Sequence, residues 1–292
     1  MAIPAEFKAH DALVSGLAFS PDGSLLATAG FDKKVVLWTV ADGKPARTIA
    51  AHNEPVYSVD FSPDGKLLVS SGADGLIRLW NPADGAPVRD LRGHSDVVSC
   101  VRFSRDGTML VSAGKDKTVR TWNVEKGAPL KQLAGHQGSA YAVALGPDGK
   151  TAASGSQDKS IRLWDLAAGS QVKELQGSDD AVLTLVFSPD GKVLYSAGMD
   201  KTIRVWDVTA GKQVKQLTGH HDFIYGLALH PDGNRLVSAG YGGNVLLWDV
   251  AAGKVLLTKK PTFGAYCVAL TTNKAAIISG HENGVCYLTA IP

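Results

Sequence analysis

Short hydrophobic runs alternate with polar turn residues along the whole chain. After His52, three such runs occupy residues 56–61, 67–70 and 77–80, separated by Pro-Asp-Gly and Ala-Asp-Gly, and a fourth occupies residues 87–91. Runs of this length, bounded by turn residues and without helical periodicity, indicate β-strands. The pattern therefore predicts an all-β fold built from four-stranded units.

The four-stranded unit recurs with a fixed period. Two series of residues show this period, because consecutive members of each series are 42 residues apart, or 84 in one case. They are Trp38, Trp80, Trp122, Trp164, Trp206 and Trp248, and His10, His52, His94, His136 and His220. About forty residues and four strands per unit are typical of a β-propeller blade. Six tryptophan-ended units and a degenerate unit over residues 261–288 predict seven blades in a single domain, residues 1–292. The degenerate unit has strand-like runs at 266–270, 275–279 and 284–288 and stops before a fourth strand.

Motifs that begin and end the units carry a resemblance to a known family. They are Gly93-His94 and Gly135-His136, the Phe-Ser-Pro-Asp-Gly sequences at 61–65 and 187–191, and the Trp-Asp endings at 161–165 and 203–207. The chain resembles the WD-repeat (Trp-Asp repeat) β-propeller family over its whole length. The resemblance implies a seven-bladed propeller of four-stranded antiparallel blades, closed by an N-terminal strand, here residues 2–8, that completes the last blade. Residues 2–7 align with residues 86–91, which places Phe7 at the position of Leu91.

Four units contain His, Ser or Thr, Asp and Trp at matching positions. Ser, His and Asp are the residue types of a nucleophilic triad, but no enzyme needs a copy in each of four blades. The resemblance implies instead a structural tetrad that joins strands within one blade, and such a buried polar chain stabilises a fold when every member is hydrogen-bonded. The sets are His10, Thr28, Asp32, Trp38; His52, Ser70, Asp74, Trp80; His94, Ser112, Asp116, Trp122; and His136, Ser154, Asp158, Trp164.

The tetrad is incomplete in the last three units. Ser178 replaces His in the fifth and Gly242 replaces Asp in the sixth, while Pro261, Asn283 and Thr289 stand at the His, Asp and Trp positions of the seventh. We expect the sixth and seventh blades to be the least stable part of the ring and to open first.

Charge and composition exclude several classes of partner. A formal net charge of +2, spread over all units, gives no field that would concentrate nucleic acid or an anionic membrane, so neither is predicted. The apolar runs are too short for a membrane span, and residues 1–10 lack the apolar stretch of a signal peptide. We expect a soluble, cytoplasmic monomer, unless the chain is trimmed from a longer protein. Cys100, Cys267 and Cys286 lie in strand-like runs and predict buried thiols.

The inner strand of each unit should face a central channel lined mostly by small residues. The exceptions are Asp60 and Arg102 on neighbouring blades, which we expect to form an ion pair. One acid cancelled by one base is not a ligand ring, the repeated histidines fall in different blades, and no Cys-x-x-Cys pair exists. The sequence therefore predicts no metal, no cofactor and no catalytic residue, and the protein is not expected to be an enzyme.

The resemblance implies that partners dock over the channel mouth, on the face carrying the loops between blades. Four of the seven blades place Tyr at the same point of this face, although aromatic residues form only 7% of the chain. Tyr offers a large, stiff contact area with one polar tip and is enriched in binding hot spots. The predicted partner-binding residues are Tyr57, Tyr141, Tyr225, Tyr266, Phe223, Tyr241, Phe31, Leu183 and Met199. An alternative is that these rings only pack against adjacent blades.

The pattern as a whole predicts a non-catalytic scaffold that binds a protein or peptide on its tyrosine-rich face. One alternative is a sensor or accessory domain of a larger, bacterial-type multidomain protein. Another is a small-molecule-binding or enzymatic propeller that uses the channel. A third is an engineered or recently amplified repeat array, although the eroded last units argue against a fully idealised design.

Overall fold

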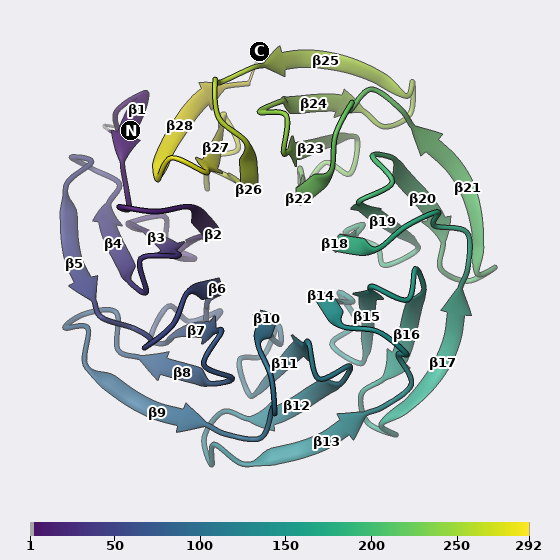
Figure 1. Ribbon diagram of the computed structural model, residues 1–292, viewed down its shortest axis with the longest axis horizontal. Coiled ribbons are helices and arrows are strands. Elements are labelled where there is room, and N and C mark those ends of the chain that lie inside the picture. The colour runs from purple at the N-terminus through teal and green to yellow at the C-terminus, as the bar shows by residue number, and fades with distance from the viewer. Residues whose placement is uncertain (1–2, 292) are drawn as a thin grey trace.

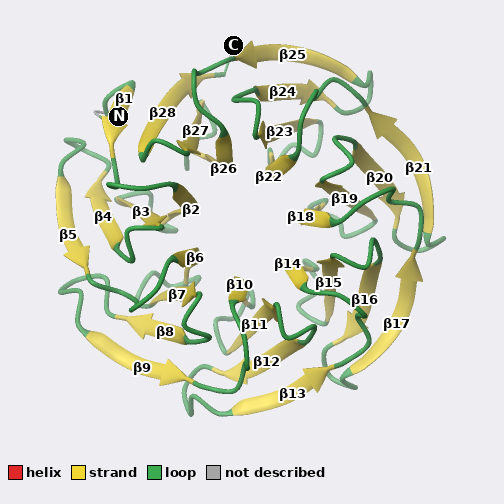
Figure 2. Cartoon of the chain, viewed as in Figure 1, coloured by secondary structure: helices red, strands yellow, loops and turns green. Residues whose placement is uncertain are grey.

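The computed structural model describes residues 3–291, which form 28 strands and no helix. Seven four-stranded antiparallel sheets stand around a central opening, each with one strand near the channel and one at the rim (Figures 1 and 2). This confirms the predicted all-β, seven-bladed propeller. Within the described range there is accordingly no helical segment that could cross a membrane.

The strands of each blade follow one another from the channel to the rim. Blades 1 to 3 contain β2 (Val14–Phe19), β3 (Leu25–Gly30), β4 (Val35–Thr39) and β5 (Pro45–Ile49); β6 (Val56–Phe61), β7 (Leu68–Gly72), β8 (Ile77–Trp80) and β9 (Pro87–Leu91); and β10 (Val98–Phe103), β11 (Met109–Gly114), β12 (Val119–Asn123) and β13 (Pro129–Leu133).

The next three blades repeat this order. Blades 4 to 6 contain β14 (Ala140–Leu145), β15 (Thr151–Ser156), β16 (Ile161–Asp165) and β17 (Ser170–Leu175); β18 (Val182–Phe187), β19 (Val193–Gly198), β20 (Ile203–Asp207) and β21 (Lys212–Leu217); and β22 (Ile224–Leu229), β23 (Arg235–Gly240), β24 (Val245–Asp249) and β25 (Lys254–Lys259).

The N-terminal strand completes blade 7, as predicted. This blade contains β26 (Ala265–Leu270), β27 (Ala276–His281), β28 (Val285–Ala290) and β1 (Glu6–Lys8). Phe7 stands opposite Cys286, as Leu91 stands opposite Ile77 in blade 2. The paired strand is shorter than the predicted 2–8, and Ala2 lies outside the described residues. The Phe7 ring packs edge-on against Trp38, 4.8 Å between centroids, and so joins blade 7 to blade 1.

The hydrophobic core lies between blades rather than at one centre. Leu37 and Ile49 of blade 1, for example, pack in one buried cluster with Phe61 and Trp80 of blade 2. Each blade is therefore covered on both faces, which explains why its second strand is buried along nearly its whole length. Stability depends on every blade having a neighbour on both sides.

Basic residues on the outer strands join each blade to the next. Each donates a side-chain hydrogen bond to a carbonyl in the last turn of the following blade: Arg47 to Ala83, Arg89 to Lys126, Lys131 to Ala167, Lys173 to Thr209 and Lys215 to Ala251. The equivalent positions on the two sides of blade 7 are Leu257 and Ala5, whose side chains cannot donate. This difference is in line with the prediction that the sixth and seventh blades open first.

Candidate functional site

The four predicted polar sets form hydrogen-bonded chains inside their blades. In blade 2 the Nδ1 of His52 bonds Asp74 at 2.8 Å, its Nε2 bonds Ser70 at 2.8 Å, and the Trp80 indole N–H donates to Ser70 at 2.9 Å. The carboxylate beside Nδ1 favours the tautomer with its proton there, and in that tautomer the Ser70 hydroxyl donates to Nε2. Blades 1, 3 and 4 repeat these bonds.

The hydroxyl residues of these chains are sealed from solvent. Thr28, Ser70, Ser112 and Ser154 are all 0% exposed, so none can meet a substrate in the folded protein. Burial alone would raise the pKa of Asp74, but hydrogen bonds from the His52 and Arg78 side chains outweigh it and hold this pKa well below its usual range. The tetrad therefore holds the strands of a blade together by hydrogen bonds, and its geometry is not that of a reactive centre.

Blade 5 lacks the imidazole, and an arginine side chain bonds its tetrad carboxylate. The Arg204 side chain, 2% exposed, bonds the Asp200 carboxylate through Nη1 and Asp179 through Nη2, the latter at 2.6 Å. The Trp206 indole still donates to Ser196 at 2.8 Å. Arg204 stands at the repeat position of Arg78, which bonds Asp74 in blade 2, and the further bond to Asp179 could not be read from the sequence.

Blade 7 replaces the loop histidine with one from a strand. His281 occupies the strand position that Gly72 occupies in blade 2. A Cβ built on Gly72 would lie 2.5 Å from His52, so a side chain here fills the space of the loop imidazole. The His281 Nε2 accordingly bonds Ser279 at 2.8 Å. The alignment of the repeats looked for a histidine at Pro261 and so missed His281. The available signal was that His281 stands where blades 1 to 3 have glycine.

Blade 6 keeps its histidine but lacks the carboxylate. His220 bonds Ser238 at 2.6 Å, and burial, with a smaller contribution from His221, lowers the pKa of His220 from 6.5 to about 4. The unfolded chain therefore binds more protons than the folded one between these values. Titration of His220 therefore leaves the free energy of unfolding unchanged above pH 6.5. It lowers this free energy by about 3 kcal/mol in total as the pH falls from 6.5 to below 4.

Gly242→Asp is expected to rebuild the tetrad of blade 6. A Cβ at Gly242 meets only the Asp222 Cβ at 3.6 Å, so the side chain has room. The new carboxylate would accept a bond from the His220 Nδ1 and favour the charged imidazole, which should add about 1–2 kcal/mol at pH 5. Urea unfolding at pH 7.5 and 5 measures this. Gly242→Ala, which changes backbone freedom alone, is the control, and an equal gain in both variants would contradict the role of the carboxylate.

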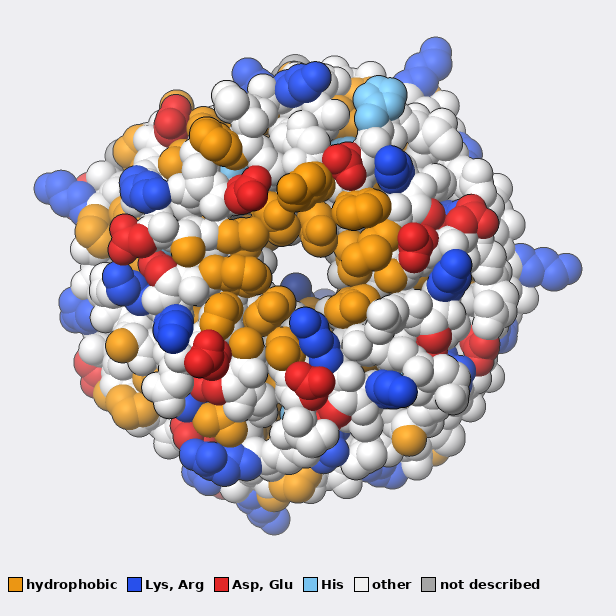
Figure 3. All heavy atoms as spheres, viewed as in Figure 1, with side chains coloured by type: hydrophobic (Ala, Val, Ile, Leu, Met, Phe, Trp, Pro, Cys, Tyr) orange, Lys and Arg blue, Asp and Glu red, His pale blue; other side chains and the backbone are white. Residues whose placement is uncertain are grey.

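The predicted partner-binding residues gather at the channel mouth. Hydrophobic side chains form a collar around the opening on the face shown in Figure 3, with most charged side chains further out. They line a depression of about 250 Å³ formed by Phe31, Tyr57, Tyr141, Leu183, Met199, Tyr225 and Tyr266, with Leu13, Ser15, Ser99 and Lys115. Tyr241, 43% exposed, stands beside this depression, and neither it nor the half-buried Phe223 lines it.

The tyrosines form groups rather than an even ring. Tyr225 stacks on Tyr266 with centroids 4.6 Å apart, and Tyr241 packs at steep angles against both. On the opposite side Phe31 contacts Tyr57 at 5.1 Å, and the Lys115 ammonium lies 5.8 Å from the Tyr57 ring. The rings thus pack against one another across neighbouring blades, and those of Tyr57, Tyr225 and Tyr266 also line the depression.

The tyrosine hydroxyls are available to a ligand. None of the hydroxyls of Tyr57, Tyr141, Tyr225 and Tyr266 hydrogen-bonds another residue within the range 3–291. Burial, helped by the neighbouring Tyr225 and Glu282, raises the pKa of Tyr266 above its usual range. This phenol therefore stays protonated and can donate a hydrogen bond at neutral pH.

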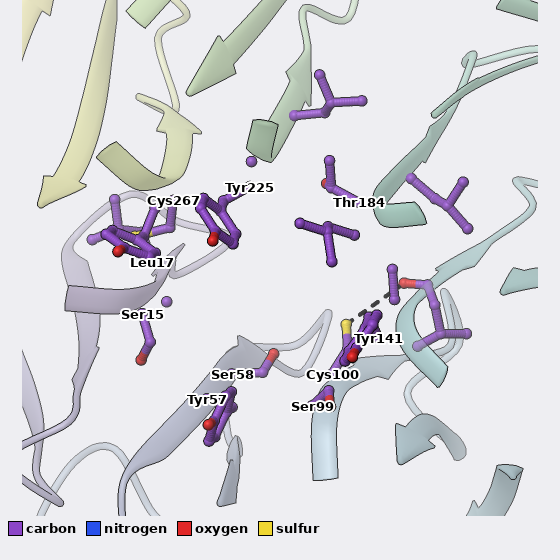
Figure 4. Close-up of a pocket in the computed structure, with 18 of the residues that line it drawn as sticks. Ser15, Leu17, Tyr57, Ser58, Ser99, Cys100, Tyr141, Thr184, Tyr225 and Cys267 are labelled. Carbon is purple, nitrogen blue, oxygen red and sulfur yellow. Dashed lines mark hydrogen bonds between the residues drawn. The ribbon is translucent and has the colours of Figure 1, made fainter. Parts of the chain in front are cut away.

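Below the mouth the channel narrows between small side chains. Ser58, Cys100, Thr184 and Cys267 line this space from four inner strands (Figure 4), and its volume is about 130 Å³. The three cysteines are free and buried, as predicted. In the part of the chain that the structure describes, no three His, Cys, Asp or Glu side chains come together in a cluster that could hold a metal ion.

The predicted ion pair between Asp60 and Arg102 was wrong. The Asp60 carboxylate accepts the backbone N–H groups of Phe61 at 3.1 Å and Phe103 at 2.9 Å. The Arg102 Nη1 donates to the Ser58 hydroxyl at 2.8 Å and to the Val101 carbonyl at 2.7 Å. The neighbouring strand thus offers backbone amides that satisfy the acid, which the sequence pattern could not reveal.

The fold and the repeated motifs define the protein class. The WD domain, G-beta repeat family (WD40) matches residues 3–39, 43–81, 85–123, 127–165, 169–207 and 211–249. These six segments make up most of the chain, which therefore belongs to the WD40 family. Propellers of this family are generally non-catalytic scaffolds for protein interaction. No curated protein sequence matches the chain.

Proposed function

We propose that this WD40 propeller is a non-catalytic scaffold that binds a peptide or protein segment at its tyrosine-lined mouth. The observation that carries the proposal is the depression where eight aromatic or aliphatic side chains converge from six blades. Contiguous apolar surface rimmed by polar groups is typical of interaction sites on folded proteins. Tyrosine rings that expose free hydroxyls can bury apolar groups and also bond a peptide backbone.

The size and lining of the depression favour a peptide over a reacting small molecule. A space of about 250 Å³ accommodates one or two side chains of a partner whose remainder lies over the surrounding face. Its lining contains one ammonium group, Lys115, and no acid, so it offers no acid–base pair for proton transfer. The expected role is therefore capture rather than catalysis.

The same proposal includes a single, monomeric domain over residues 1–292 that acts in the cytoplasm. Continuous packing from blade to blade around the ring supports one domain. Three free, buried cysteines are consistent with a reducing compartment.

Replacing Tyr225 and Tyr266 with Ala tests the site. Peptides selected from a random phage-displayed library on the wild-type protein should bind the double variant about 10- to 1,000-fold more weakly, because two stacked hot-spot rings are lost. Calorimetry measures the affinity, and an unchanged circular dichroism spectrum verifies the fold. The control is Val172→Ala with Val214→Ala, both 62% exposed on the outer strands. Full affinity in the tyrosine variant would place binding elsewhere.

A further inference from the structure

Arg102 places a cation inside the channel, below the tyrosine-lined mouth. Its Nη1 donates hydrogen bonds to the Ser58 hydroxyl and the Val101 carbonyl. Neither Nε nor Nη2 has a hydrogen-bond partner within residues 3–291, although a guanidinium carries five donors. Arg102 lines the same cavity as the tyrosines of the mouth and also lines the cavity at the opposite end. A group that enters between the tyrosines can therefore reach its free donors.

No acidic side chain among residues 3–291 bonds this guanidinium directly. Asp60 is the nearby acid, but its carboxylate is directed to two backbone amides and lines neither cavity. Burial raises the pKa of Asp60 and the nearby Arg102 charge partly offsets this, but the hydrogen bonds of the two side chains go to other partners. A half-buried cation without an ionic partner is costly, and a carboxylate from a ligand would supply both the charge and the hydrogen bonds.

The charges around the mouth distinguish its two sides. Lys115 lies beside Tyr57, on the side of Arg102. On the opposite side the Asp222 and Glu282 charges contribute to the raised pKa of Tyr266, and no such acid lines the depression itself. An anionic group is therefore favoured near blades 2 and 3, and an apolar group near the stacked tyrosines of blades 6 and 7.

The cavity size limits what can reach Arg102. About 130 Å³ corresponds to roughly four water molecules at about 30 Å³ each. This space admits a single acidic side chain or the end of a peptide, and it excludes a folded element.

We infer that the peptide bound at the mouth carries a carboxylate that enters the channel and bonds Arg102, while an apolar side chain of the same peptide covers Tyr225 and Tyr266. The inference rests on the proposed function and specifies the chemistry of the partner. Two sources share this chemistry, an Asp or Glu side chain and a free C-terminus. A bidentate bond to guanidinium suits either one.

Arrays of random octapeptides in three matched series test this inference. The first series has a free C-terminal carboxylate, the second a C-terminal amide and an internal Asp or Glu, and the third a C-terminal amide with Asn or Gln at that site. Wild-type protein should bind one carboxylate series at least tenfold more tightly than the neutral series, and the preferred series identifies the source.

Arg102 variants link the preference to the channel. Arg102→Met should abolish the preference for carboxylate peptides, Arg102→Lys should retain part of it, and the control Arg105→Gln, on an exposed turn, should leave it unchanged.

An unchanged preference in Arg102→Met overturns the inference. Equal binding of all three series by the wild type also overturns it, even if Arg102→Met fails to fold. If that uniform binding is still lost in the Tyr225→Ala, Tyr266→Ala variant, the proposed function stands and only the carboxylate is wrong. Absence of binding in every series contradicts both.

Discussion

Deletion of residues 1–8 should open the ring at blade 7 and lower the melting temperature by about 10–20 °C. The deletion removes β1, so β28 becomes an unpaired edge and loses the bond from the Leu288 N–H to the Ala5 carbonyl. Ile3, 5% exposed, and the Phe7 ring against Trp38 are lost as well. Burial of two such side chains is worth about 2 kcal/mol each, and an exposed edge also promotes aggregation.

Control variants test whether the lower melting temperature comes from loss of ring closure rather than from any change in the N-terminal strand. Glu6→Ala and Lys8→Ala alter exposed side chains of β1 and should leave the melting temperature nearly unchanged. A synthetic peptide of residues 1–9, added to the truncated protein, should restore part of the loss. Hydrogen exchange should show weaker protection of β26–β28 than of β6–β8. An unchanged melting temperature after deletion, or equal protection of these two blades, would contradict the closure and the proposed order of opening.

Ser112→Ala should cost about 3–5 kcal/mol, because one hydroxyl holds two buried partners. The Trp122 indole N–H donates to Ser112 at 2.9 Å, and the His94 Nε2 bonds it at 2.7 Å. Both partners keep their desolvation cost when the hydroxyl is removed, at about 1–3 kcal/mol for each unsatisfied group. Urea unfolding monitored by tryptophan fluorescence measures the loss.

Blade 5 provides a matched control within the same chain. Ser196 accepts the Trp206 indole N–H at 2.8 Å, but Ser178 stands where a histidine would bond it. Ser196→Ala leaves one buried group without a hydrogen-bond partner instead of two. We therefore expect it to lower the free energy of unfolding by about half as much as Ser112→Ala does. Equal costs would mean that the imidazole contributes nothing to the stability of a blade.

The number of blades, the strand order and the closure were predictable because they depend on local, repeated signals. The alternation of strand and turn residues specifies each unit, and the constant period means that one interpretation applies to all of them. Phe7 could be placed opposite Cys286 because its segment aligns with residues 86–91. The first, third and fourth predicted strands of blade 2 coincide with β6, β8 and β9, and the second is shifted by one or two residues at its ends.

The sequence by itself also indicated seven of the residues that line the channel mouth, since the position within a repeat specifies the face, but it added Phe223 and Tyr241, which lie beside the depression. Only the tertiary structure decided how these residues meet across repeats. The stacking of Tyr225 on Tyr266, the bond from Arg204 to Asp179, the use of His281 in place of a loop histidine, and the lack of a direct bond between Asp60 and Arg102 all depend on distances between strands or blades. A repeat pattern specifies which positions are equivalent, but it does not specify which hydrogen-bond partner lies nearest to each side chain. The unused Nε and Nη2 donors of Arg102 therefore became visible only in the tertiary structure.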